Sequence, residues 1–493
     1  MQKGLLMRKN GYKTSVKRIA AGVLAAAMSL SLTACGGAKE EKVEKPSESP
    51  VPTVERLQAD WVDTAILYEV NVRQYTEEGT FQAFSGHLER LKKMGVNTLW
   101  FMPIYTIAQE NKKGSLGSYY AIKDYYSVNE EFGTLEDFQE LVEQAHSMGF
   151  HVILDWVANH TGWDHTWITE HPEYYLKDGS GAIISPVDQD WDDVAQLDYT
   201  NPEMRKAMID AMKYWVNDIG VDGFRCDYAQ GVPVEFWEEA RTELDKIKPV
   251  YMVAEDGTQS NSFMNHAFDS DYNFAVYNML EQIARGGNKA DDLIYKLDVM
   301  LPDGAFAMNF LDNHDKNTYD GTLNKRFGED AIGVFTSFIF TIPGMPLIYS
   351  GQEESMDLSL EFFEKDVIPF GTYKYSELLT ALCTIKSSYK ALNNDHTGGK
   401  LVIHEDDNRK VLAYSRTREG KTITVVVNMS DEEQQVEFKD KIVTSQVLLH
   451  GNTEGIITNN TVDGSIREDI SETVKNKDLQ KLTPWEYYIL ICE

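Results

Sequence analysis

The chain has 493 residues, of which 25% are charged and 42% are hydrophobic, and its formal net charge at pH 7 is −31. A surface this acidic repels nucleic acid and anionic lipid headgroups, so we expect no nucleic-acid partner and no direct binding to a membrane surface. The length exceeds the usual size of one domain, so a large domain with a smaller companion is expected.

The first 34 residues have the pattern of an export signal. Six Lys or Arg and no acidic residue precede residue 19, and an apolar run then extends to Leu32. This run has the length of a signal sequence and is short for a membrane span. It ends in Leu32-Thr-Ala-Cys35, which resembles the bacterial lipobox. The resemblance implies cleavage before Cys35 and a lipid on its thiol.

We therefore predict a lipoprotein signal peptide over residues 1–34, followed by the lipidated Cys35 and a flexible tether over residues 35–58. The tether is rich in Lys, Glu, Ser and Pro, a composition that cannot form a core. A lipid chain anchors a domain without spanning the bilayer. The protein is accordingly expected at the extracellular face of the bacterial membrane, with the lipid as its only membrane contact.

From about residue 80 onward, amphipathic helices alternate with short apolar strands. The helix faces recur at three- and four-residue spacing and end at Gly95, Gly149 and Gly220. Apolar runs typical of buried strands occupy 65–70, 96–102, 151–154, 221–224, 250–254, 305–311 and 345–349. Such runs between amphipathic helices indicate a parallel sheet covered by helices. About eight such units predict a (β/α)8 barrel over residues 59–391, with the chemistry at the C-terminal ends of its strands.

Two segments depart from this alternation. Residues 161–200 are rich in Trp, Tyr, Asp and Gly and separate the third predicted barrel strand from the next helix, which indicates a short excursion from the barrel. After residue 391 the pattern changes to short β runs separated by turn residues. These runs predict a C-terminal antiparallel β-sandwich over residues 392–493.

Carboxylates stand where several predicted strands end. One strand ends at Asp155, and others lead to Asp227, Glu255 and Asp315. Acids on a barrel rim also serve solubility or metal binding, but four of them after apolar strands favour chemistry. Glycoside cleavage needs such a set, because one carboxylate attacks the anomeric carbon while a protonated one donates to the leaving oxygen. Arg225 lies two residues before Asp227 on the same strand, so it projects to the same side and favours the ionised carboxylate.

Six strings of the chain, in the right order on the right strands, resemble the signature regions of the α-amylase family, glycoside hydrolase family 13. These strings are residues 155–160, 223–227, Glu255, 310–315, 344–353 and 117–125. The resemblance covers essentially the whole chain from about residue 65. Any one string is a weak match, and the specificity comes from their combination.

The resemblance implies a role for each matching residue. It assigns Asp227 as the nucleophile, Glu255 as the acid/base and Asp315 as the stabiliser of the transition state. It also places Tyr120 under the sugar ring at the cleavage subsite. Contacts to the hydroxyl groups of that sugar are assigned to His160, Arg225 and His314.

One departure from the family concerns calcium. Asn159 matches the family's calcium-binding Asn, and a hydrogen bond that fixes the loop is its alternative role. Gln230 and Gly231 stand where many members have a Lys-His pair, whose His carbonyl helps to hold calcium. We therefore expect that no cofactor is required, with a calcium site at Asn159 as the alternative.

The resemblance implies a retaining hydrolase that acts on α-1,4-glucosidic bonds in starch-like glucans or maltooligosaccharides. A neopullulanase- or cyclomaltodextrinase-like hydrolase, an α-glucosidase and a glucanotransferase remain open, because water and a sugar acceptor compete for one intermediate. A non-catalytic glycan-binding surface lipoprotein is the alternative from another class, but such a protein is free to lose the three acids that this chain retains. The sequence leaves the oligomeric state open.

Overall fold

The computed structural model describes residues 56–187, 189–258, 261–297, 301–439, 442 and 445–492. The predicted signal peptide, Cys35 and most of the predicted tether lie outside the described residues. Within these ranges, no helix combines the length and the apolar character needed to cross a membrane.

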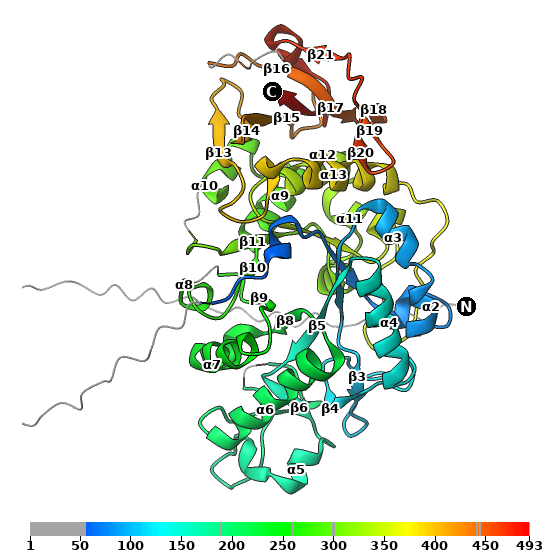
Figure 1. Ribbon diagram of the computed structural model, residues 1–493, viewed down its shortest axis with the longest axis vertical. Helices are drawn as coiled ribbons and strands as arrows, with labels where there is room; N and C mark the ends of the chain where they lie inside the picture. Colours follow the sequence, from blue (N-terminus) through cyan, green and yellow to red (C-terminus); the bar gives the residue numbers. More distant parts are fainter. Residues whose placement is uncertain are drawn as a thin grey trace, which may run out of the picture. The chain divides into compact units, whose positions relative to one another are not determined.

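Eight parallel strands close into a barrel in the order β1-β12-β11-β10-β9-β8-β5-β2 (Figure 1). They are Leu67–Val70 (β1), Thr98–Phe101 (β2), His151–Val157 (β5), Gly223–Asp227 (β8), Tyr251–Ala254 (β9), Ser270–Tyr272 (β10), Phe306–Asn309 (β11) and Met345–Tyr349 (β12). The strands are almost wholly buried, because side chains fill the interior and helices cover the outside. The predicted (β/α)8 barrel is confirmed.

The helices begin and end at ordinary sequence signals. Thr134 and Asp137 form a capping box at the start of α4, and Asn201 caps α6 with Pro202 at its first position. The longer helices are Leu88–Met94 (α3), Leu135–Ser147 (α4), Pro202–Tyr214 (α6), Val234–Asp245 (α7), Phe274–Ala284 (α9), Glu329–Thr341 (α12) and Ser376–Ser388 (α13). The shorter ones are Val72–Tyr75 (α1), Phe81–Ser85 (α2), Thr166–Glu170 (α5), Asn261–Met264 (α8), Ile294–Leu297 (α10) and Leu323–Phe327 (α11).

The sixth barrel strand, β10, has no counterpart among the predicted strands. It has only three residues, and two of them, Ser270 and Asp271, are polar, so it lacks the apolar run by which the other strands are recognised. Burial of these side chains is compensated by hydrogen bonds. Ser270 Oγ lies 2.5 Å from the Tyr251 hydroxyl, and Asp271 Oδ1 accepts from the backbone N–H of Gly257 at 2.9 Å.

Two antiparallel pairs extend from the C-terminal ends of the barrel strands. After β2, strands Tyr105–Ile107 (β3) and Ile122–Val128 (β4) pair with each other. The excursion after the third barrel strand contains the paired strands His160–Gly162 (β6) and Val194–Gln196 (β7), with α5 between them. The loop between β3 and β4 and the loop before β7 both reach the cavity described below.

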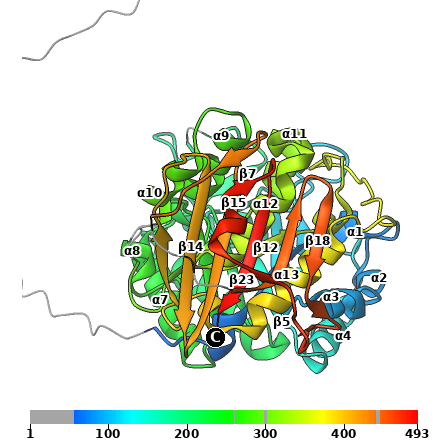
Figure 2. The same cartoon turned by 90° about the horizontal axis from the view of Figure 1, so that it is seen from above.

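The C-terminal region is an antiparallel sheet in the order β13-β14-β15-β23-β17-β18, with β21 paired to β17 (Figure 2). Its strands are Lys400–His404 (β13), Val411–Arg418 (β14), Lys421–Asn428 (β15), Ser445–Asn452 (β17), Gly455–Asn459 (β18), Thr473–Val474 (β21) and Tyr487–Cys492 (β23). Two further two-stranded sheets pair Gln434–Gln435 (β16) with Lys481–Leu482 (β22) and Thr461–Val462 (β19) with Ser465–Ile466 (β20).

Apolar side chains cover both faces of the large sheet. One face packs on the barrel helices, where the Tyr414 hydroxyl lies 2.6 Å from Thr341 Oγ1 of α12. The other face packs under β16 and β22 through a separate cluster that includes Val426, Leu482 and Leu490. The predicted C-terminal antiparallel sheet is confirmed, and its second layer is small.

Candidate active site

A cavity of about 480 Å³ lies at the C-terminal ends of the barrel strands. Its volume is typical of sites that enclose a small ligand. Among its lining residues are six of the seven predicted catalytic and substrate-binding residues: Tyr120, His160, Asp227, Glu255, His314 and Asp315. The seventh, Arg225, lies directly beneath them and is fully buried.

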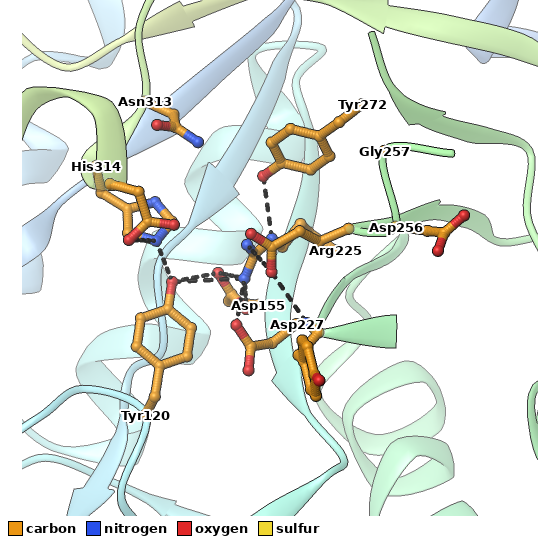
Figure 3. A network of polar contacts seen from close by, with 12 residues as sticks. Tyr120, Asp155, Arg225, Asp227, Asp256, Gly257, Tyr272, Asn313 and His314 are labelled. Carbon is orange, nitrogen blue, oxygen red and sulfur yellow. Dashed lines mark hydrogen bonds and ion pairs between the residues drawn. The ribbon is translucent and has the colours of Figure 1, made fainter. Parts of the chain in front are cut away.

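Arg225 contacts three carboxylates with one guanidinium group (Figure 3). Its Nη1 donates to Asp155 Oδ1 at 2.9 Å and to Asp227 Oδ1 at 3.0 Å, while Nη2 lies 2.8 Å from Glu255 Oε2. Its Nε donates to the Tyr272 hydroxyl at 3.1 Å. Asp227 and Glu255 therefore sit on neighbouring nitrogens of a rigid planar cation, which fixes their mutual position.

The carboxylates around Arg225 outnumber their cation. Burial raises the pKa of Asp227, Arg225 opposes this effect, and Glu255, Asp155 and Asp315 add to it. Burial also raises the pKa of Asp155 to about 6, again against the opposing effect of Arg225. Like charges this close cannot all ionise without cost, so the cluster retains a proton at a pH where isolated carboxyls have lost theirs. A site that holds both an ionised and a protonated carboxyl has the components of general acid catalysis.

A second series of hydrogen-bonded side chains, formed by His314 and Glu69, borders Tyr120. The Tyr120 hydroxyl lies 2.8 Å from His314 Nε2, and His314 Nδ1 lies 2.6 Å from Glu69 Oε1. Burial opposes the imidazolium form, but the negative charges of Asp315 and Glu69 outweigh it and raise the pKa of His314 to about 9. His314 is therefore a cation at neutral pH and directs an N–H toward the Tyr120 oxygen.

Glu69 is a site residue that the sequence analysis does not identify. It lies on β1, is fully buried and neutralises His314 from a strand more than 200 residues earlier in the chain. A signal for it exists in the sequence, since Glu69 is the one charged residue in the apolar run 65–70. A carboxylate inside a buried strand needs a hydrogen-bond or ion-pair partner, so its presence indicates a buried polar network.

Tyr228 is a second residue that the sequence analysis does not identify. It follows Asp227 and adopts φ +41°, a left-handed conformation that is uncommon for an aromatic residue. This turn directs its backbone N–H to Glu255 Oε2 at 2.9 Å. The strained turn therefore joins the end of β8 to the acid at the end of β9.

His160 and Asn159 lie on the excursion side of the cavity. Burial lowers the pKa of His160 to about 4, so the ring is neutral at pH 7. Its Nδ1 accepts from Asn159 Nδ2 at 3.2 Å, while Asn159 Oδ1 accepts from Gln196 Nε2 at 3.0 Å. Asn159 is thus held between His160 and Gln196 by hydrogen bonds.

The residues around Asn159 do not fit a calcium site. Calcium takes six to eight oxygen ligands, usually with carboxylates among them. Here the Asn159 oxygen already accepts a hydrogen bond, and a Cβ at position 231 would lie 2.4 Å from the Tyr228 ring and 2.8 Å from that oxygen. Gly231 therefore leaves a space that Tyr228 fills. In the part of the chain that the structure describes, no group of three or more His, Cys, Asp or Glu side chains could hold a metal ion.

Aromatic rings form the side walls of the cavity. Phe362 stacks on Tyr120 with ring centroids 6.0 Å apart, and Tyr319 lies 5.8 Å from Phe362. On the excursion side, Trp191 packs edge-on against Tyr228 at 5.1 Å. Flat apolar rings around a polar floor suit the faces of sugar rings, which are apolar while their edges carry hydroxyls.

Known proteins resemble this chain over most of its described length. A family model described as the catalytic domain of alpha amylase matches residues 64–192 and 186–449. The structure of a noncanonic maltogenic alpha-amylase, AmyB from Thermotoga neapolitana, is 30% identical, with a TM-score of 0.74 over 87% of this chain and 99% of that one.

Two curated relatives are longer than this chain. Alpha-amylase MalA of Haloarcula japonica is 26% identical over 395 residues, which are 76% of this chain and 56% of that protein. The intracellular maltogenic amylase of Bacillus subtilis is 26% identical over 396 residues, which are 73% of this chain and 64% of that protein. The chain therefore spans less than two thirds of the length of either relative.

Proposed function

Because this chain belongs to the α-amylase family, glycoside hydrolase family 13, we propose that it is a retaining hydrolase of α-1,4-glucosidic bonds in starch-like glucans or maltooligosaccharides. The observation that carries this proposal is the contact of Asp227 and Glu255 with adjacent nitrogens of the buried Arg225. Two carboxyl groups held side by side are what a double displacement at one anomeric carbon requires.

In the first step, Asp227 attacks the anomeric carbon while Glu255 gives its proton to the departing glycosidic oxygen. Nη1 of Arg225 stabilises the ionised form of Asp227 at 3.0 Å. Glu255 is the proton donor in this step, and its carboxyl is held 2.8 Å from Nη2 of Arg225. The C–O bond to the leaving sugar breaks as the ester bond to Asp227 forms.

In the second step, Glu255 takes a proton from a water molecule, and that water attacks the glycosyl ester of Asp227. The ester bond breaks, Asp227 regains its negative charge and the sugar leaves with its original anomeric configuration. The Tyr228 N–H donates to Glu255 in the structure and holds this carboxyl in place for both proton transfers.

The remaining residues bind the ring and its developing positive charge. Asp315 lines the cavity and lies 3.6 Å from His314, so it supplies negative charge near an oxocarbenium-like transition state. Tyr120 offers its ring face to the sugar. We assign His160, Arg225 and His314 to the sugar hydroxyls because all three present N–H groups at or beneath the cavity floor.

A maltogenic specificity is the candidate that the comparisons favour within the family, because AmyB and the Bacillus subtilis relative are both described as maltogenic. Cyclomaltodextrinase-like, neopullulanase-like, α-glucosidase and glucanotransferase activities are the other candidates. A non-catalytic glycan-binding role is disfavoured because the chain retains all three acids in one cavity.

The proposed setting is the extracellular face of a bacterial membrane, with Cys35 lipidated and residues 35–58 as tether. The last three of these residues already contact the folded part of the chain, at Asp269, Asp245 and Asp395. This part of the proposal is supported by the lipobox-like string and the acidic composition. An extracellular α-glucan is then the substrate, and no metal is required for turnover.

Product analysis tests the proposed function. The purified protein is incubated with soluble starch, cyclodextrin, pullulan and maltotriose, and the products are separated by chromatography while NMR follows the anomer formed first. Release of maltooligosaccharides or maltose as the α-anomer is expected. The β-anomer as first product, or no cleavage of any of the four substrates, would contradict the proposal.

A further inference from the structure

Three loops meet beside the cavity. They are the loop between β3 and β4, the excursion segment before β7, and the long loop between β12 and α13. Lys113 of the first loop, Asp193 of the second and Phe363 of the third all line the cavity. We call the joined part of these three loops the wall.

Lys113 joins the β3–β4 loop to the excursion. Its Nζ lies 3.1 Å from Asp192 Oδ1, 3.3 Å from Asp193 Oδ1 and 2.5 Å from the backbone oxygen of Asp190. A lysine ammonium group has three donors, and here three acceptors surround it. The Asp193 side chain is 7% exposed, so this contact is partly desolvated and stronger than an ordinary surface ion pair.

Glu364 joins the same loop to the segment after β12. Its Oε1 accepts from the Ser115 backbone N–H at 2.8 Å, and its Oε2 accepts from the Ser115 hydroxyl. The backbone N–H of Leu116 donates to the Phe363 oxygen at 3.1 Å. A Cβ at position 114, where φ is +63°, would lie 2.4 Å from the Phe363 Cβ, so the two loops are in close contact.

The part of the wall formed by the β12–α13 loop lies on the Tyr120 side of the cavity. Figure 3 shows Tyr120 and His314 on one side of the Arg225–Asp155 pair, with Asp256 and Gly257 on the other. Asp256 follows Glu255, the proposed proton donor, directly, so we take the Asp256 side of the cavity as the side of the leaving sugar. Phe362, next to Phe363, stacks on Tyr120. The wall therefore faces the glycone, the part of the substrate that carries the non-reducing end.

We propose that Lys113 and Glu364 form a latch that closes the glycone end of the cavity and restricts the enzyme to the non-reducing ends of α-glucan chains. This inference rests on the proposed function and adds the end of the glucan chain at which the enzyme acts. An enzyme that cuts within a chain needs a groove open at both ends, whereas here three loops are joined across one end. The products are then short, because the closed side admits only the first few sugars of a chain.

The test compares two substrates that differ only at the non-reducing end: p-nitrophenyl maltoheptaoside with that end free or chemically blocked. The wild-type protein should cleave the free substrate at least about tenfold faster, equivalent to about 1.4 kcal/mol of discrimination. The double variant Lys113→Ala, Glu364→Ala opens the wall, so its rate on the blocked substrate should rise and the ratio should fall at least about threefold.

Lys123→Ala is the matched control. Lys123 also pairs with the excursion, at 3.2 Å from Asp164, but it does not line the cavity. For Lys123→Ala, the ratio of the rate on the free substrate to the rate on the blocked substrate should equal the wild-type ratio. Equal wild-type rates on both substrates would overturn the latch and leave the proposed function standing, whereas no cleavage of either would overturn both.

A second measurement does not depend on whether the variants fold. The wild-type protein digests long maltooligosaccharides, and products are sampled at early times. Short products of one or two main lengths, with the remaining chain shortened stepwise, are expected. Early products spread over many lengths would contradict a closed glycone end.

Discussion

A single buried arginine organises the candidate site at the scale of residues. Arg225 is fully buried and pairs with Asp155, Asp227 and Glu255 at 2.8–3.0 Å. Removing one partner of such a cluster leaves buried charge without compensation, which is costly. The conservative change of a carboxylate to its amide therefore separates chemistry from folding better than truncation does.

Asp227→Asn is expected to preserve the fold and glucan binding while turnover falls by a factor on the order of 10⁴ or more, because an amide cannot form the glycosyl ester. The measurement is the initial rate on maltooligosaccharides together with the melting temperature. Asp320→Asn, which removes an exposed carboxylate paired with Lys316, serves as the control and should retain full activity. Residual activity within about tenfold of the wild type would assign the nucleophile elsewhere.

His314 makes a pH-dependent contribution to stability. Its pKa is raised from 6.5 to about 9 in the folded protein by Asp315 and Glu69, against the effect of burial. Because the folded value is the higher one, the contribution is fully present below pH 6.5 and is lost as the pH rises toward 9. Relative to His314→Gln, the wild-type free energy of unfolding should fall by about 3 kcal/mol across this range.

Denaturant unfolding of both proteins between pH 6 and pH 9.5 measures this difference. The variant lacks the titrating group, so changes common to both proteins cancel. A difference that does not fall as the pH rises would show that folding does not raise the pKa of His314.

At the scale of elements, packing and hydrogen bonds fill the turn after β8. Tyr228 adopts a left-handed conformation, its ring fills the space over Gly231, and the Asn159 amide pairs with Gln196. The loops around the excursion are therefore joined by hydrogen bonds and aromatic contact.

Removal of calcium should accordingly change little. Excess chelator is expected to shift the melting temperature by less than about 2 °C, since that is the shift produced by less than about 1 kcal/mol in a domain of this size. Differential scanning calorimetry with and without chelator makes the measurement. A larger drop that added calcium restores would mean that other ligands form a site.

At the scale of the whole molecule, the described chain begins at the opposite end of the barrel from the cavity. Arg56 Nε lies 3.0 Å from Asp269, and its Nη1 donates to the backbone oxygen of Phe268 at 2.6 Å. Both partners immediately precede β10, whereas Glu255 immediately follows the neighbouring parallel strand β9. Arg56 therefore holds the start of the described chain far from the catalytic acids.

This separation predicts the effect of removing the proposed anchor. Cys35→Ser should shift the protein from the membrane fraction to the medium, or leave it unprocessed, because no thiol is present to take the lipid. Specific activity on soluble glucan should stay unchanged, since the attachment end of the barrel is not the catalytic end. Detergent phase separation is the measurement, and a wild-type protein in the aqueous phase would refute lipidation.

The sequence by itself determined the barrel, the C-terminal antiparallel sheet and the positions of the carboxylates on the strand ends. These features follow from local patterns, because alternating apolar strands and amphipathic helices can bury their surfaces together in few ways. The family resemblance rests on the same strand ends and is confirmed by the comparisons. The roles of Asp227, Glu255 and Asp315, the lipid on Cys35 and the domain boundaries stay predictions.

Only the tertiary structure decided which distant groups meet. Barrel closure places β1 beside β12 and so brings Glu69 to His314, and three loops converge so that Ser115 reaches Glu364 across 249 residues. The polar strand β10 is a strand because its neighbours supply hydrogen bonds, not because of its own side chains. Burial and pairing energies of this kind depend on what surrounds a residue after folding, and a local pattern carries no record of those surroundings.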